Sequence, residues 1–223
     1  KTDPTLQMNK KNIPEGIEFL DVYVSTMEPY QQKVYNLFIE KQKEKSAFMN
    51  MERFGYTWLS TPLSLLNMVY PTEDVDAYVE KDEPMDPGMM AECHGAEGLN
   101  SVVSYEETAG AEGTGIPLLS EFEYKPEVLE KHGRIFELEK IGTFSAKIAQ
   151  ICKCIQQSTG IVLIYSKFIQ AGLIPMALAL EEMGFTRAGK AKTFFKEDSR
   201  KPPLDALTME PKTEKGSHVA KYV

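Results

Sequence analysis

The sequence predicts an α/β fold in which helices cover a parallel sheet. Two observations carry this prediction: an amphipathic helix pattern over residues 145–157, and a run of five apolar residues, 161–165, that follows it. A second helical pattern ends at Phe185, so helix, strand, loop and helix follow one another along the chain. This alternation is typical of parallel sheets that are buried on both faces.

The first elements expected are a strand over residues 17–24 and a helix whose start lies in residues 25–29, with Ser25 and Glu28 as a capping box. The strand sequence IEFLDVYV alternates in polarity, and proline is tolerated in the first turn of a helix. A second helix is expected over residues 61–71, with proline near its start and proline at its end. Its leucine spacing predicts that Leu63 and Leu66 are buried.

An acidic segment, residues 72–127, follows these helices. It holds 15 acidic and 2 basic residues, against 18 acidic and 23 basic in the rest, so the net charge of −8 divides into −13 and +5. Its Gly, Pro and Glu content predicts a loosely ordered, solvated insertion, with a regulatory or docking role as the alternative. The insertion would separate an opening unit, residues 1–71, from a core segment, residues 128–223.

The core segment is expected to begin with a short helix over residues 126–132, closed by Gly133. Residues 135–138 form a short strand or a turn in this interpretation. Ser145 then caps the main helix, whose apolar face repeats at helical spacing. That face consists of Ile148, Ile151, Cys152 and Ile155.

Residues 161–165 are the central prediction. This run is too short for a helix and too apolar for a half-exposed edge, so we expect a strand with both faces buried. Pro175 and Gly184 suit the start and the end of the next helix. Glu181 and Glu182 lie near its end, where we expect them to face solvent.

Composition limits the class of protein. No apolar stretch approaches the roughly 20 residues that cross a bilayer, and no signal-like segment is present, so we expect a soluble, intracellular, cytoplasmic protein without a membrane partner. Three cysteines do not indicate a disulfide framework. Residue 1 is Lys, and the alternating residues 218–223 suggest a strand that has just begun, so we expect a piece of a longer polypeptide, truncated at its C-terminus.

Three sequence patches resemble a known family. SAKI, GIVLIYSKF and GLIPMALALEEMGF are similar to the first half of the second RecA-like domain of superfamily 2 helicases and DNA translocases. More narrowly, they resemble the helicase-like ATPases of nucleocytoplasmic large DNA viruses, in which IVLIYSKF would be motif IV. IPEGIEFLDVYVSTMEPYQQKVY and PLSLLNMVYP resemble earlier parts of that domain, so the likeness covers a little over half of the chain. It implies a partial RecA-like, P-loop NTPase-type fold.

The resemblance implies a motor whose catalytic parts lie elsewhere. The sequence has no GxxxxGK[ST], no DEAD or DEAH tetrapeptide and no QxxGRxxR. This chain alone is therefore expected to be inactive and to hold no cofactor, with ATP and Mg²⁺ implied for the full-length protein. The expected partners are the rest of its own polypeptide, including the first RecA-like domain, and nucleic acid, with DNA favoured over RNA. For a viral protein the expected location is the cytoplasmic virus factory or the virion.

The resemblance also implies a nucleic-acid contact at the loop after motif IV. Ser166 and Lys167 match the positions that hold phosphates, and Arg187 and Lys190 could widen the basic surface. The alternatives are a helix cap for Ser166 and a solvated surface position for Lys167. The expected function is a noncatalytic segment of an ATP-dependent helicase or translocase that grips the backbone and transmits domain closure. The alternative is a protein–protein interaction module that keeps the fold without motor activity.

The sequence does not favour metal or nucleophile chemistry. Cys93 and His94 have no further ligand at zinc-site spacing. Cys152 and Cys154 are two residues apart on a helix, so their side chains diverge. We therefore expect no catalytic residue and no metal site in this chain.

Overall fold

The computed structural model describes residues 23–46, 57–83, 85, 88–108, 118–189, 193–212 and 218–223. The structure is 54% helical and 13% strand, so the predicted mixture of helices and strands is confirmed. Most of the predicted strand 17–24 lies outside the described residues. In chain order the elements are α1 (Pro29–Ser46), α2 (Thr57–Asn67), α3 (Glu73–Lys81), the 3-10 helix η4 (Met89–Cys93), α4 (Gly95–Val102), β1 (Val103–Thr108), β2 (Leu118–Tyr124), α5 (Pro126–Lys131), α6 (Leu138–Phe144), α7 (Ala146–Gln157), the π-helix η5 (Ile169–Leu173), α8 (Ile174–Glu182), β3 (Thr186–Arg187), the 3-10 helix η6 (Glu197–Ser199) and β4 (Lys221–Tyr222).

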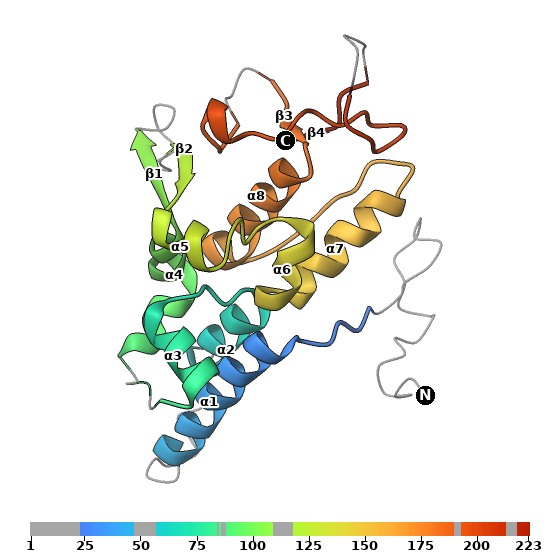
Figure 1. Cartoon of the computed structure of the whole chain (residues 1–223). Helices are drawn as coiled ribbons and strands as arrows, with labels where there is room; N and C mark the ends of the chain where they lie inside the picture. The colour runs from blue at the N-terminus through green and yellow to red at the C-terminus, as the bar shows by residue number, and fades with distance from the viewer. Residues whose placement is uncertain are drawn as a thin grey trace, which may run out of the picture.

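The helices form the body of the molecule and the strands lie at its margins (Figure 1). Helices α1, α2 and α3 gather at one end, α6, α7 and α8 form the middle, and β3 and β4 lie at the opposite end beside the C-terminus. Among the described residues the strands make two small sheets, an antiparallel β1–β2 hairpin and a parallel β3–β4 pair. The β4 strand confirms the strand expected near residue 220.

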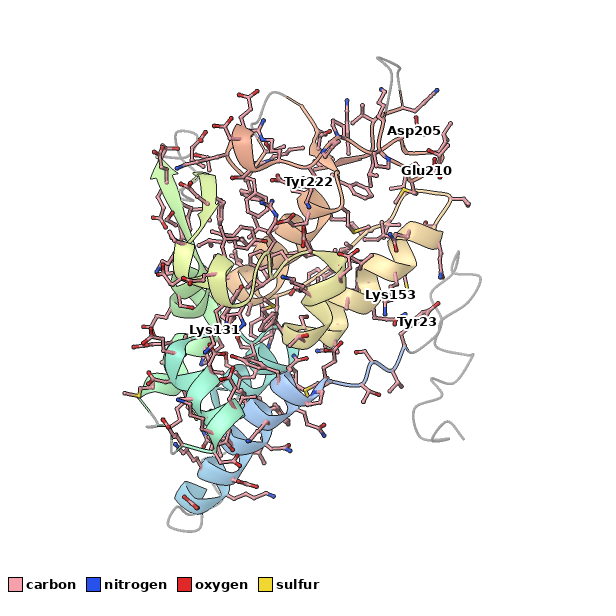
Figure 2. The ribbon with its side chains drawn as sticks, in the orientation of Figure 1. Tyr23, Lys131, Lys153, Asp205, Glu210 and Tyr222 are labelled. Carbon is pink, nitrogen blue, oxygen red and sulfur yellow. The ribbon has the colours of Figure 1, made fainter. Side chains whose placement is uncertain are left out.

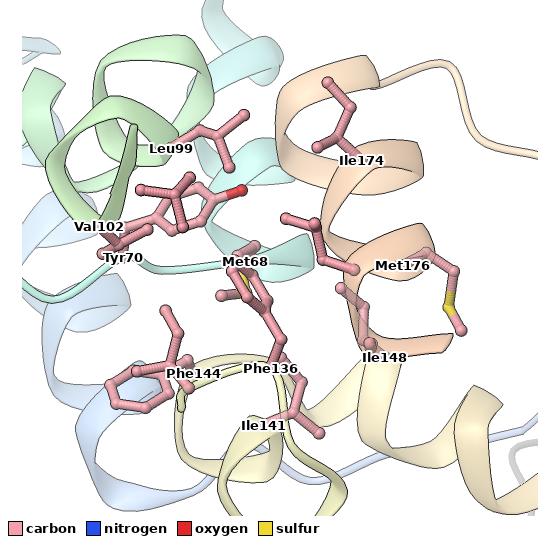
Figure 3. Close-up of a cluster of buried hydrophobic side chains, with 14 of the residues drawn as sticks. Met68, Tyr70, Leu99, Val102, Phe136, Ile141, Phe144, Ile148, Ile174 and Met176 are labelled. Carbon is pink, nitrogen blue, oxygen red and sulfur yellow. The ribbon is translucent and has the colours of Figure 1, made fainter. Parts of the chain in front are cut away.

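One large apolar core joins the two halves of the chain. Figure 3 shows Met68, Tyr70, Leu99, Phe136 and Ile148 converging from α4, α7 and the segments next to α2 and α6. A second core lies between α1, α2, α3 and η4. Its buried members are Val34, Leu37, Phe38, Leu65, Val69, Val75, Met85, Met90 and Cys93.

The helices with the strongest sequence signals form where they were predicted. The Ser145 hydroxyl accepts a hydrogen bond from the Ile148 amide and caps α7. The α7 face is buried as predicted, except that Ile151 is half-buried. Helix α5 ends before Gly133, whose φ of +70° is a conformation that glycine adopts without strain. Residues 135–138 adopt a turn that leads into α6.

Helix α2 differs from its predicted bounds. It begins at Thr57, so Pro62 lies inside the helix and not at its start. Proline has no amide hydrogen, so α2 loses one backbone hydrogen bond, the one that would reach the carbonyl four residues earlier in the first turn. The buried leucine is Leu65, while Leu63 and Leu66 are half-buried, because the face of α2 that meets α1 is set by packing between the two helices.

The prediction of a loosely ordered insertion at residues 72–127 is wrong for its described residues. They form α3, η4, α4 and the β1–β2 hairpin, and Val75, Leu99, Val102 and Phe122 are fully buried. Short helices of eight or nine residues each bury only a few apolar side chains, so their periodicity is weak within an acidic composition. The segment is part of the cores and not a solvated arm.

The prediction of a buried central strand at residues 161–165 is also wrong. These residues, which we call the apolar segment, form no strand among the described residues, and Ile161, Leu163 and Tyr165 are 103%, 94% and 89% exposed. Figure 1 shows an extended connection without helix or strand after α7, on the way to α8. The reason is that no described strand pairs with the segment, and a lone strand cannot satisfy its backbone groups.

The stability of two leucine variants tests this correction. Leu178 in α8 is fully buried, so Leu178→Ala should lower the free energy of unfolding by about 2–5 kcal/mol. Leu163→Ala, its matched control in the apolar segment, should change it by less than about 0.5 kcal/mol. Chemical denaturation measures both values. A large loss of unfolding free energy in Leu163→Ala would contradict the exposed position and favour the buried strand.

Candidate interface around residues 160–167

The apolar segment has the side-chain pattern of a strand without being paired. The chain makes no helix, turn or bend from Ile161 to Ser166. Odd-numbered side chains face solvent, whereas Val162 is 45% exposed and Ile164 packs against the main core. This two-residue period places one face of the segment on the protein and leaves the other uncovered.

The backbone of the segment is equally open. Within the described chain, no hydrogen bond involves the amide or carbonyl groups of residues 161–165. The nearest hydrogen bonds lie at its two ends, where Gly160 donates to the Ser158 hydroxyl and Phe168 donates to the Ser166 hydroxyl. The segment therefore presents a row of backbone donors and acceptors to its surroundings.

A cavity of about 690 Å³ lies beside the segment. The helix α8 lines it through apolar side chains, among them Ile174, Met176 and Leu180. Residues 160–164 and residues 220–223 also line it, so the apolar segment and β4 border one cavity. Its volume is within the range of ordinary ligand sites.

Ser166 does not offer a free hydroxyl in this structure. Its Oγ accepts from the Phe168 amide at 3.1 Å and donates to the Phe168 carbonyl at 3.2 Å. Serine commonly makes such local bonds in turns. The cap expected of Ser166 thus belongs to a turn before η5, and phosphate binding by this hydroxyl would require the turn to open.

The structure separates the predicted basic residues. Lys167 is exposed, with its ammonium 5.0 Å from the centre of the Phe168 ring. Arg187 is half-buried, with its guanidinium carbon 5.1 Å from the centre of the Phe194 ring, and it lines the cavity. The cavity lining includes Arg187 but not Lys167. Lys190 lies outside the described residues.

Sequence reasoning missed the other side of the cavity. Lys221 and Tyr222 line it from β4, and the Tyr222 hydroxyl donates to the Glu181 carboxylate. Figure 2 places Tyr222 at the end of the molecule that carries β3 and β4. The alternation in HVAKYV was the available signal, but it did not indicate which surface β4 would border.

The prediction that Glu181 and Glu182 face solvent is wrong, because both are buried. Arg134 Nε donates a bifurcated hydrogen bond to both Glu182 carboxylate oxygens at 3.0 Å, and the Tyr124 hydroxyl donates to Oε1 at 2.7 Å. Burial raises the pKa of Glu182 above its ordinary value of 4.5, against the opposing effect of those donors. Glu181 accepts from the Phe194 and Phe195 amides at 2.6 and 2.8 Å.

A third buried carboxylate, Asp76, joins three helices. It accepts hydrogen bonds from the Tyr30 hydroxyl at 2.7 Å, His132 Nε2 at 2.8 Å and the Lys131 ammonium at 2.9 Å. Burial by itself would raise the pKa of Asp76, but bonds from His132, Tyr30 and Lys131 outweigh it and hold the pKa below its ordinary value of 3.8. The cluster links α1, α3 and the end of α5, so we assign it a structural role.

The thiols do not form a reactive site. Burial raises the pKa of both Cys93 and Cys152 to about 12, so these thiols are protonated at neutral pH. The described residues contain no cluster of three or more His, Cys, Asp or Glu that could hold a metal ion.

Comparisons with known proteins do not assign the interface. No family model, no curated protein and no solved structure matches the chain. Among the described residues, no helix combines the length and the apolar character needed to cross a membrane.

The Asp76 cluster predicts a pH dependence of stability. Because its folded pKa is lowered, the contribution of Asp76 is fully present above about pH 4 and is lost as the pH falls through the folded pKa, below 3.8. Asp76→Asn should lower the free energy of unfolding at pH 6 by about 1.5–3 kcal/mol, and the difference should shrink below about pH 4. Denaturation across pH measures this difference.

Glu130→Gln is the matched control, because Glu130 is exposed on α5, in the same region as the cluster. It should change the free energy of unfolding by less than about 0.5 kcal/mol at every pH. An Asp76→Asn loss that stays constant down to pH 2 would contradict the assigned role of the ionised carboxylate.

Proposed function

We propose that this chain is a noncatalytic segment of an ATP-dependent nucleic-acid helicase or translocase, and that it contacts the nucleic-acid backbone at the turn that holds Lys167. The observation that carries the proposal is the order of α7, an extended apolar segment, an exposed polar turn and α8. This order along the chain matches that of the patches that resemble motif IV, although residues 161–165 form no strand among the described residues. A parallel β3–β4 pair beyond α8 supports the same class of fold.

The physical basis of the contact is charge on an accessible turn. Lys167 is exposed, and it follows a segment that is itself open to solvent. A lysine ammonium binds phosphate without reading sequence, so the contact would hold a strand in place and would not select bases. Ser166 would act by shaping the turn, since its hydroxyl bonds Phe168.

The proposal assigns ATP and Mg²⁺ to other parts of the full-length protein. The sequence lacks the phosphate-binding loop, and no acidic cluster among the described residues could hold a metal. No hydrolytic step is therefore assigned to this chain. In the proposal, other parts of a longer polypeptide hold the nucleotide. This segment binds the nucleic-acid backbone and transmits domain closure.

A protein–protein interaction module is the second candidate. The observation that favours it is the exposure of Ile161, Leu163 and Tyr165, which lie next to an apolar cavity. Grouped apolar side chains at the surface commonly mark sites for partners. This function does not require Lys167, so the two candidates can be tested apart.

Binding of a labelled single-stranded oligothymidylate tests the proposed nucleic-acid contact. We expect weak binding whose affinity falls as salt rises, because each phosphate contact releases counterions. Lys167→Glu should weaken binding and lower the slope of log K against log salt by about 0.7 for the lost contact. Fluorescence polarisation over a salt series measures both quantities.

Lys153→Glu is the control of equal charge change, because Lys153 is an exposed lysine on α7 (Figure 2). It should reduce affinity less than Lys167→Glu does. Equal losses in the two variants would mean that binding follows net charge alone, and the assignment of Lys167 would fail.

A further inference from the structure

We propose that the cavity between the apolar segment and β4 is a docking site for an extended polypeptide strand that pairs with both. The inference goes beyond nucleic-acid binding and gives the interaction surface a partner of defined chemistry. The strand would be apolar on the face that meets α8, and it would carry a carboxylate.

The first edge of the site is the apolar segment itself. Its five residues have unpaired amide and carbonyl groups along the described chain, and its exposed fractions alternate with the period of a strand. Only another extended backbone presents donors and acceptors at the same spacing. Extended polypeptide is therefore the ligand class that satisfies this edge.

The second edge is the outer side of β4. Ala220 and Tyr222 use their carbonyls to accept hydrogen bonds from Thr186 and Ala188, at 2.9 and 2.7 Å. Lys221 lies between them opposite Thr186, so in a parallel ladder its own amide and carbonyl point to the other side. Outside the β3–β4 ladder, no backbone bond joins Lys221 to another described residue.

The floor of the site is apolar. Leu173, Met176, Ala177 and Leu180 line it from η5 and α8, and Phe185 lines it from the turn that follows. A strand that lies across this floor would place alternate side chains against it and would join the apolar segment and β4 into one sheet.

Charge selects the partner further. The cavity lining contains Arg187 and Lys221 but no acidic side chain. A partner strand with one carboxylate would complement the Lys221 ammonium, whereas a second copy of residues 161–165 brings no acidic residue. The site thus favours a foreign strand over pairing between copies of the chain.

A fluorescent capped peptide, Val-Thr-Val-Thr-Val-Glu, is the probe. We expect saturable binding in fluorescence polarisation, and weaker binding when its Glu is replaced by Lys. Two further peptides carry N-methyl groups on the odd or on the even residues. Successive amides of a strand point to opposite edges, so each series blocks one edge without changing any side chain.

Pairing with both edges predicts that each N-methylated peptide binds about tenfold weaker or worse, since each loses several hydrogen bonds. A loss in only one series would mean that one edge alone is used, which overturns the two-edged site. Equal binding by all three peptides would mean that only the apolar surface is recognised, and this also overturns the proposal. Failure of the parent peptide to saturate up to millimolar concentration overturns it as well.

Leu163→Pro and Leu163→Ala form the matched pair in the protein. Proline removes one backbone donor that has no partner within the described chain, and the Leu163 side chain lies outside the cores, so folding should be preserved in both variants. Leu163→Pro should bind the peptide about three- to tenfold weaker than Leu163→Ala. Equal affinity in the two variants would exclude pairing at this edge.

Two controls separate this inference from other outcomes. Lys167→Glu should leave peptide affinity unchanged, so a failed nucleic-acid contact and a failed docking site are distinguishable. Sedimentation of the unmodified chain should show no dimer that Leu163→Pro dissolves. Such a dimer would mean that a second copy of this chain occupies the site, and it would overturn the proposal of a foreign strand.

Discussion

Two adjacent carboxylates at the end of α8 are the constraint on which the arrangement around the cavity depends. Glu182 accepts hydrogen bonds from Arg134 and from the Tyr124 hydroxyl. Glu181 accepts hydrogen bonds from the amides of Phe194 and Phe195 and from the Tyr222 hydroxyl. Neighbouring helical residues point in different directions, so the pair binds segments on two sides of the helix. Loss of one partner from such a buried charge typically costs about 3–5 kcal/mol.

These bonds fix the cavity between two unlike walls. The α8 floor and β4 are linked by the hydrogen bond from Tyr222 to Glu181, whereas the apolar segment packs on the core through Ile164 and leads into the turn at Ser166. One wall is therefore tied down by hydrogen bonds, and the backbone of the other makes none within the described chain. An unpaired edge of this kind suits the proposed strand addition, in which main-chain bonds form on contact.

Sequence reasoning succeeded where local signals act alone. The Ser145 cap, the apolar face of α7 and the end of α5 before Gly133 depend on neighbours within a few residues. It failed at residues 161–165 because a run of apolar residues specifies a strand only if other strands supply its hydrogen bonds. It failed at Glu181 and Glu182 because their donors lie far away in the sequence.

The sequence by itself determined α5, α7, the Ser145 cap and the mixture of helices and strands, because propensity and periodicity are local properties. Tertiary structure alone decided that residues of the acidic segment enter the cores, that two glutamates are buried, and that the apolar segment and β4 border one cavity. Burial and pairing depend on contacts between residues that are distant along the chain, and no local pattern encodes which partners will be present.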